Sequence, residues 1–447
     1  MINMLKRIIW GFSLAFLSVG LNAQQTSGFN LDAAIEYAWT NSTAIKNAQL
    51  NIVDAAEQII ERRAVGIPQI TGTLNYQRYL KVPQQALPDA FVDFISALNP
   101  GEPVNREVSF FLRNNFSATA NLDAVIFDGS YLTALKAARS YRRYVQEEFA
   151  VTRREVKNGV IDAYLPVLLL NENLKMLDDN ISNLSGLFNE TKALYKEGFA
   201  EQLDVDRLEL SLANLEVEKE NLSRQKEIAI NILKFAMNYP ATQDLTVDDN
   251  LSAFVELEQA DLTDVINPQG RPEVILANSG VELNEMNVKV NKMGYYPTIR
   301  AFGTYAQNYQ GNTTEDDFWA PQSLIGLTVN IPIFDGWDKK AKIQRARIAT
   351  ELSRNQQRDL ERSIILEVTN ARQAYQTALK SLQAQERNLQ LAQRIYDTTQ
   401  IKYREGVGSS LEVNQAEQAL YTSQSNQIRA MYDLTVARFS LRKALGK

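Results

Sequence analysis

Between Ile364 and Tyr403, apolar and aromatic residues recur in alternating steps of four and three positions. Only Gln385 and Thr399 interrupt the series, and the positions between are mostly polar. This spacing is the heptad pattern of a helix that supercoils against its neighbours. Because neither Gly nor Pro occurs in 337–405, the pattern predicts one helix over that range, roughly 100 Å long at 1.5 Å per residue.

The same pattern occurs 208 positions earlier, with nearly the same register and residue classes. An Asp-Gly pair precedes each long helix, and a Tyr and a Gly close each one: Asp128 and Gly129, Asp335 and Gly336, Tyr195 and Gly198, Tyr403 and Gly406. A period of 208 is much longer than a solenoid unit. The duplication therefore predicts two structurally equivalent halves.

The first 23 residues have the composition of a signal peptide. Lys6 and Arg7 form a charged start, an apolar stretch runs to Leu21, and the small residue Ala23 follows. We therefore expect 1–23 to be a signal peptide and the rest of the chain to be exported.

The periodicity then divides the exported chain into two repeats with the same order of elements. The first repeat, 24–262, is expected to hold a helix over 31–65, a strand pair within 69–127 with a long loop at 79–110, a long helix at 130–197, a helix at 202–237 and an irregular linker. The second repeat, 263–447, is expected to hold a helix over 273–292, a strand pair within 298–334, the long helix 337–405 and a helix at 409–445.

Each of the four strands alternates apolar and polar residues over about ten positions, as Ile70, Leu74 and Tyr76 do within 69–78. A small soluble sheet with one buried face would show the same alternation. Two equivalent hairpins on an exported chain favour strands of a transmembrane β-barrel. Since four strands are too few to enclose an interior, we expect several chains to share the barrel.

Composition excludes most other function classes. The chain has no Cys and no His, which removes thiolate metal sites, Cys nucleophiles, His general bases and Ser-His-Asp triads. We therefore predict no enzyme activity and propose no catalytic, cofactor-binding or metal-binding residues. A net charge of −6 also argues against a nucleic-acid partner.

Over residues 30–447 the sequence resembles the TolC family of outer-membrane efflux and secretion channel proteins. The duplication, the segment from Ile331 to Gly336 and the segment from Tyr403 to Val413 carry the resemblance most specifically. It implies a mainly α protein with a membrane β-barrel. Three internally duplicated protomers would form a 12-stranded β-barrel in outer-membrane lipid and a 12-helix α-barrel in the periplasm.

The function that the resemblance implies is a passive exit duct of a tripartite efflux or type I secretion system. Its partners would be a periplasmic adaptor protein and an inner-membrane transporter, and its location would be the cell outer membrane with a long periplasmic portion. The alternative is a soluble periplasmic coiled-coil scaffold or adaptor. Heptads fit both functions, whereas an adaptor has no need of four amphipathic strands.

The resemblance also implies a mouth that closes through tyrosine and carboxylate contacts. The expected aperture residues are Tyr195, Gly198, Asp204, Tyr403, Gly406, Gly408 and Glu412. By position, Tyr403 matches the family's tip tyrosine, and Glu412 matches an inward-facing carboxylate with Asp204 as its first-half counterpart. Gly408 stands where some members have an arginine, and Gln415 where some have a second carboxylate.

The acidic residues near the helix starts also have an interpretation that involves no role in transport. Glu412 and Asp204 would be favourable as solvated acids near the positive end of a helix. Asp128 and Asp335, each followed by a Gly and a long helix, are expected to cap free backbone N–H groups rather than to act in transport.

Overall fold

The computed structural model describes residues 27–101, 103–109, 111–255, 265–311 and 318–447. The expected signal peptide at 1–23 and the repeat boundary between 262 and 263 lie outside these residues. The chain forms two compact units. One takes its described residues from 1–46, 153–266 and 367–447, and the other from 47–152 and 267–366. Each unit thus combines elements of both repeats.

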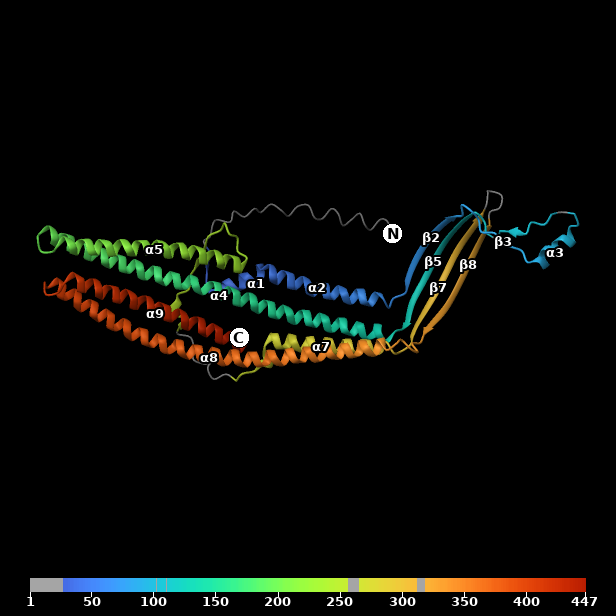
Figure 1. Cartoon of the computed structure of the whole chain (residues 1–447). Coiled ribbons are helices and arrows are strands. Elements are labelled where there is room, and N and C mark those ends of the chain that lie inside the picture. The colour runs from blue at the N-terminus through green and yellow to red at the C-terminus, as the bar shows by residue number, and fades with distance from the viewer. Residues whose placement is uncertain (1–26, 102, 110, 256–264, 312–317) are drawn as a thin grey trace, which may run out of the picture. The chain divides into compact units, whose positions relative to one another are not determined.

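The long helices have almost the bounds that the heptads predict. They are α4 (Gly129–Lys196) and α8 (Asp338–Arg404), and each is followed by a shorter helix, α5 (Gln202–Met237) and α9 (Ser410–Leu445) (Figure 1). Pro166 lies within α4 without ending it. Among the described residues, no helix is both long and apolar enough to cross a membrane.

The predicted N-terminal helix is two helices, α1 (Leu31–Asn41) and α2 (Thr43–Ala64). Asn30 caps α1, because its side chain accepts a hydrogen bond from the backbone N–H of Ala33 at 2.8 Å. The break falls at Ser42, whose ψ of 131° is not helical. There the Asn41 carbonyl accepts a hydrogen bond from the Asn238 side chain at 2.9 Å, an alternative to a bond within the helix.

Four strands form one antiparallel sheet in the order β2 (Gln69–Arg78), β5 (Asn114–Phe127), β7 (Thr298–Gly311) and β8 (Phe318–Asn330) (Figure 1). The two predicted hairpins therefore lie side by side, joined through β5 and β7. β2 and β8 are the edges.

The expected strand region 298–334 extends too far. β8 ends at Asn330, and Ile331 to Phe334 lie beyond the strand. Pro332 gives the physical reason, because it has no N–H to donate to a neighbouring strand. Pro321 is accommodated within β8 because β8 is an edge strand.

The predicted loop at 79–110 contains secondary structure that is not predicted from the sequence. Helix α3 (Asp89–Leu98) lies between two short paired strands, β3 (Gln85–Ala86) and β4 (Glu107–Val108). Pro88 immediately precedes α3, a position where proline is compatible with a helix start. Reading the nearby prolines only as loop signals was therefore wrong.

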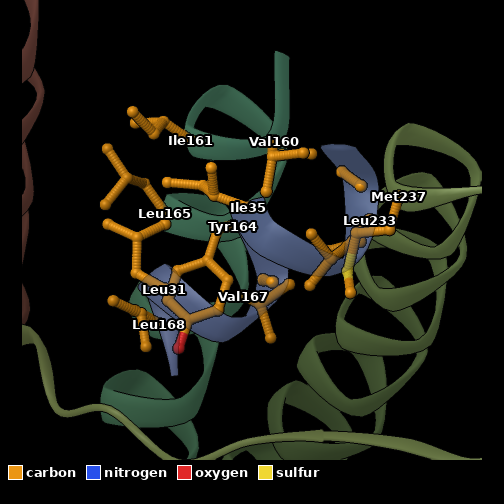
Figure 2. Packing of buried hydrophobic residues seen from close by; sticks show 14 of the residues in the cluster. Leu31, Ile35, Val160, Ile161, Tyr164, Leu165, Val167, Leu168, Leu233 and Met237 are labelled. Atoms are coloured by element: carbon orange, nitrogen blue, oxygen red, sulfur yellow. The ribbon is translucent and has the colours of Figure 1, made fainter. Parts of the chain in front are cut away.

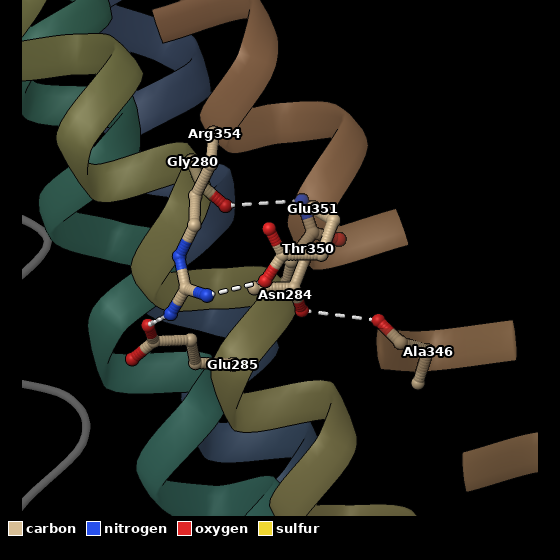
Figure 3. A network of polar contacts seen from close by, with 7 residues as sticks. All are labelled: Gly280, Asn284, Glu285, Ala346, Thr350, Glu351 and Arg354. Carbon is tan, nitrogen blue, oxygen red and sulfur yellow. Dashed lines mark hydrogen bonds and ion pairs between the residues drawn. The ribbon is translucent and has the colours of Figure 1, made fainter. Parts of the chain in front are cut away.

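In the second unit, α7 (Pro272–Met293) packs along α8 through polar contacts (Figure 3). Arg354 of α8 donates hydrogen bonds to Glu285 of α7 at 2.6 Å and to Glu351 of its own helix at 2.5 Å. One guanidinium thus binds two carboxylates and links α8 to α7.

In the first unit, the linker predicted to be irregular is ordered where it is described. Strand β6 (Leu245–Val247) pairs in parallel with β1 (Ser27–Phe29), and α6 (Leu251–Val255) follows. Neither strand is predicted from the sequence, because a three-residue strand is too short to show periodicity.

This linker is attached to the hydrophobic core of α1, α4 and α5 (Figure 2). Tyr164 of α4 is fully buried, and its hydroxyl donates a hydrogen bond to Asp249 at 2.8 Å. The same carboxylate oxygen accepts a hydrogen bond from the Leu31 N–H at 2.8 Å. Burial, together with the nearby Asp249, raises the pKa of Tyr164, so its hydroxyl stays protonated and keeps donating.

Candidate functional site

The turn from α4 to α5 depends on a glycine. Gly198 has φ +76°, a left-handed conformation that disfavours other residues. Its N–H donates to the Tyr195 carbonyl at 3.0 Å, and the Phe199 N–H donates to the Leu194 carbonyl at 2.8 Å. These bonds satisfy carbonyl groups at the end of α4 and reverse the chain tightly.

The turn from α8 to α9 repeats this arrangement. Gly406 has φ +75° and donates to the Tyr403 carbonyl at 3.0 Å. Gly408 donates to the Lys402 carbonyl at 3.1 Å, and a Cβ added at Gly408 would lie 3.1 Å from the Tyr403 nitrogen. The backbone is therefore packed too closely for a larger side chain at 408 without a local shift.

The two hairpins are joined just beyond these turns. One Asp204 oxygen accepts a hydrogen bond from the Glu201 N–H at 3.3 Å, and the other accepts one from the Ser410 hydroxyl. Arg207 donates to the Ser410 oxygen at 3.4 Å. Ser410, the first residue of α9, is buried, so this contact connects the first turns of α5 and α9. We call Asp204, Arg207 and Ser410 the hairpin clamp.

Glu412 does not behave like its first-half counterpart Asp204. Its backbone N–H donates to the Ser409 hydroxyl at 3.3 Å, which caps α9, and its side chain is exposed. No hydrogen bond or ion pair joins the Glu412 carboxylate to another of the described residues. The repeat equivalence therefore fails here, since only Asp204 contacts the other hairpin.

The two tip tyrosines also differ. Tyr403 is partly buried against an apolar cluster, whereas Tyr195 has an exposed fraction of 41%. The cluster draws on all four tip helices and consists of Leu184, Leu187, Leu208, Ala392, Tyr396, Val413, Ala416 and Leu420. An ion pair between Arg404 and Glu190, at 3.4 Å, adds a second link between α8 and α4.

At the first strand-to-helix turn, one Asp128 oxygen accepts hydrogen bonds from the N–H groups of Ser130 and Tyr131 at 2.9 and 3.1 Å. These are the contacts of a helix cap. The next residue, Gly129, lies close to α7, because a Cβ there would be 3.2 Å from the Met293 sulfur.

At the second such turn, Asp335 accepts hydrogen bonds from the Lys339 backbone N–H at 3.1 Å and from the Lys339 ammonium at 2.9 Å. The ammonium hydrogen bond, followed by the backbone one, lowers the pKa of Asp335. Gly336 and Trp337 both have positive φ, +63° and +69°. The backbone conformation of this turn thus differs from that of the first, although both turns begin with Asp-Gly.

A cavity of about 560 Å³, not predicted from the sequence, lies between α4, α5, α8 and α9. Glu417 is the half-buried carboxylate in its wall, and burial raises the pKa of Glu417 to about 7. A signal was present, since Glu417 lies four positions after Val413 and three before Leu420, an acid on an apolar heptad seam. Ser410 and Arg207 carry no comparable signal, because their partners lie on the other hairpin.

Comparison with known proteins gives the context for this geometry. A family model described as outer membrane efflux protein matches residues 34–239 and 269–447. The pyoverdine export outer membrane protein OpmQ of Pseudomonas aeruginosa is 22% identical over 418 residues, covering 93% of this chain and 85% of that protein. The outer membrane protein TolC of Vibrio cholerae is 19% identical over 414 residues, covering 88% and 85%.

The fold is also that of a solved channel. The open-state structure of the MtrE outer membrane channel of Neisseria gonorrhoeae has a TM-score of 0.70 at 18% identity, covering 93% of this chain and 88% of that one. The resemblance to TolC-like proteins expected from the duplicated hairpins is confirmed. Since the family model matches most of its length, the chain belongs to the outer membrane efflux protein family.

Proposed function

We propose that the protein is the outer-membrane exit duct of a tripartite efflux or secretion system and that it works as a homotrimer. Family membership supports efflux across the outer membrane. The proposal that the chain is an oligomer in the outer membrane rests on the four-stranded sheet. Among the described residues, each of its edge strands, β2 and β8, pairs with only one strand, and one face of the sheet is apolar.

Two rows of cross-strand partners define the apolar face. Ile70, Leu122, Gly303 and Ile325 are successive partners across the sheet, and Ile70 and Ile325 have exposed fractions of 78% and 92%. Partners in adjacent antiparallel strands point to the same face. This row forms an exposed apolar band suited to lipid.

The second row is aromatic and lies nearer the loop end of the sheet. Tyr76, Phe116, Tyr309 and Trp319 are successive partners across all four strands. The Trp319 ring lies 5.1 Å from Tyr309 and 6.4 Å from Phe116. Tyr76 is six positions from Ile70, about 20 Å along a strand. An apolar band bordered by aromatic residues is typical of barrels at a membrane interface.

The open edges support the oligomer. In the proposed trimer, β8 of each protomer pairs with β2 of the next, which closes a 12-stranded β-barrel without exposed strand edges. The hairpins α4–α5 and α8–α9, with α2 and α7, would form the 12-helix α-barrel in the periplasm. There a periplasmic adaptor and an inner-membrane transporter would supply substrate, and the duct itself would be passive.

The hairpin clamp supports a closed mouth within each protomer. Asp204, Arg207 and Ser410 hold the first turns of α5 and α9 together, so separating the two hairpins must break their hydrogen bonds. In this proposal the clamp, rather than a side chain at position 408, holds the mouth closed, because the residue there is Gly408. Glu412, exposed on α9, is the carboxylate proposed to face the pore.

Fractionation of two matched variants tests the membrane part. Leu74→Lys places a charge on the apolar face, at about 2–4 kcal/mol near the middle of a bilayer. Asn75→Lys adds the same charge on the opposite face of β2, since neighbouring residues alternate. We expect wild type and Asn75→Lys in the outer-membrane fraction and Leu74→Lys depleted from it. Recovery of wild type with soluble periplasmic proteins would instead favour the scaffold or adaptor function.

A further inference from the structure

The cavity between the four tip helices has the features of a small-molecule site. Its volume of about 560 Å³ is within the usual range for ligand pockets. All four helices belong to one chain, and the contributing segments lie in one compact unit. The cavity is therefore complete in a single protomer and does not depend on the proposed trimer.

Glu417 is a partly buried carboxylate in the wall of this cavity, where a hydrogen-bonding or oppositely charged partner would stabilise its ionised form. Burial raises its pKa to about 7, and no hydrogen bond or ion pair joins its carboxylate to another described residue. The other titratable groups in the walls are Arg207 and Glu218 of α5, Tyr396 of α8 and Tyr421 of α9. Arg207 donates to Ser410 at 3.4 Å and so belongs to the clamp.

The other wall residues indicate what kind of partner fits. Tyr396 and Tyr421 supply aromatic surfaces, which attract organic cations. The amides supply acceptors for ammonium N–H groups, and the leucines supply apolar surface: Asn180, Asn183, Asn214, Asn414, Leu184, Leu210, Leu215, Leu411 and Leu420. An anion would meet the carboxylates of Glu417 and Glu218. A bare metal ion is not favoured either, because the described residues include no group of three or more acidic side chains that could hold one.

We propose that this cavity binds a small organic cation with one ammonium group and a short apolar portion, and that the Glu417 carboxylate accepts the ammonium hydrogen bond. The tyrosine rings and leucines enclose the apolar portion. Because α9 supplies the carboxylate and α5 supplies Leu210, Leu215 and Asn214, a bound cation contacts both hairpins. This inference goes beyond the duct function and does not require it.

The duplication provides a matched control. Glu209 is the first-half equivalent of Glu417, 208 positions earlier, at the corresponding place in α5. Its side chain is exposed and does not line the cavity. Glu417→Gln and Glu209→Gln therefore remove the same charge from equivalent helix positions, but only the first removes it from the cavity.

Isothermal titration calorimetry with the purified full-length protein in detergent tests the site. Benzylammonium is the probe, benzyl alcohol is its uncharged equivalent, and a titration of protein-free micelles is subtracted. We expect saturable benzylammonium binding to wild type and to Glu209→Gln. The affinity should be at least about tenfold weaker for Glu417→Gln, a change of about 1.4 kcal/mol, and similarly weaker for benzyl alcohol on wild type.

The pH dependence of wild-type binding supplies a second test if Glu417→Gln does not fold. Benzylammonium stays charged at neutral pH, so its affinity should rise as Glu417 loses its proton around pH 7. The proposal is overturned if wild type shows no saturable binding, if Glu417→Gln binds as well as Glu209→Gln, or if affinity does not change across this pH range. None of these results bears on membrane location or channel activity, so the proposed duct function is tested separately.

Discussion

At the scale of single residues, two adjacent serines at the start of α9 have different roles. Ser409 caps the helix by accepting the Glu412 N–H, whereas Ser410 contacts Asp204 and Arg207 of the other hairpin. Their side chains are identical, so alanine substitution at each position separates helix capping from the link between hairpins.

We predict that Ser410→Ala raises the single-channel conductance or open probability in planar bilayers, because it removes the hydroxyl that links the hairpins. Ser409→Ala should lower stability by about 1 kcal/mol through loss of a cap and leave the conductance unchanged. Equal conductance for Ser410→Ala and wild type would show that the clamp does not limit opening.

Glu412 gives a second residue-scale prediction. If its exposed carboxylate faces the pore, three copies in the trimer would attract cations by concentrating negative potential in a narrow passage. Glu412→Gln should then lower cation selectivity and weaken block by trivalent cations, with the trimer intact. Reversal-potential measurements under a salt gradient report the selectivity. Unchanged selectivity and block would mean that Glu412 faces away from the pore.

The buried carboxylate of Glu417 gives a pH-dependent prediction. Burial raises its pKa from 4.5 to about 7, so the folded protein holds this proton more tightly than the unfolded chain. By linkage, its contribution to stability is full below about pH 4.5 and is lost as the pH rises to about 7. Thermal unfolding should show wild type losing stability relative to Glu417→Gln over this interval. If the stabilities of wild type and Glu417→Gln changed in parallel with pH, the raised pKa of Glu417 would be contradicted.

At the scale of elements, the heptad pattern was sufficient for α4 and α8, because a stripe sustained over many turns defines a helix by itself. The short elements β1, β6 and α3 could not be predicted in this way. Strand β1 forms against β6, more than 200 positions away, and neither is long enough to show a period. The ordered structure of β1 and β6 depends on contacts such as the hydrogen bond from Tyr164 to Asp249, two residues that only the fold brings together.

The same distinction holds for the candidate site. The sequence was sufficient to find the turn glycines Gly198 and Gly406, because a closing glycine after a long helix is a local signal. It could not separate Asp204 from Glu412, which occupy equivalent positions in the two repeats. The difference arises from Ser410, whose hydroxyl reaches Asp204 from the other hairpin.

The prediction at the scale of elements concerns the start of helix α4. Asp128 accepts the N–H groups of Ser130 and Tyr131 where β5 passes into α4. Asp128→Ala should therefore destabilise the protein by about 1 kcal/mol, whereas Asp128→Asn keeps a capping oxygen and should be nearly neutral. Thermal unfolding followed by circular dichroism measures the difference. Single-channel conductance should be normal in both variants, and a large change in conductance at unchanged stability would assign Asp128 to transport instead.

At the scale of the whole molecule, each chain has hydrogen-bonding groups at its sheet edges that remain without strand partners in the described part of a single copy. The edges of β2 and β8 carry backbone N–H and C=O groups that pair with no other described strand. Exposed edges of this length promote association with further strands. Strand pairing between copies would satisfy these groups, and closure into a ring would leave none exposed.

The number of chains in that ring is the last prediction. Two chains would give eight strands, about the number whose interior side chains fill, whereas three give twelve and leave room for a passage. We therefore expect native mass spectrometry of the detergent-solubilised protein to show three chains. Cysteines introduced at Leu74 in β2 and Val329 in β8, both on the apolar face, in a chain that otherwise has none, should form disulfide-linked species up to a trimer only if these edges meet. Cysteine at Ala118 in the central strand β5, which lies on the same face, combined with Val329→Cys, is the matched control and should give no linked chains. A stable monomer would remove the argument for a shared barrel, and a dimer would make the passage too narrow for the proposed duct.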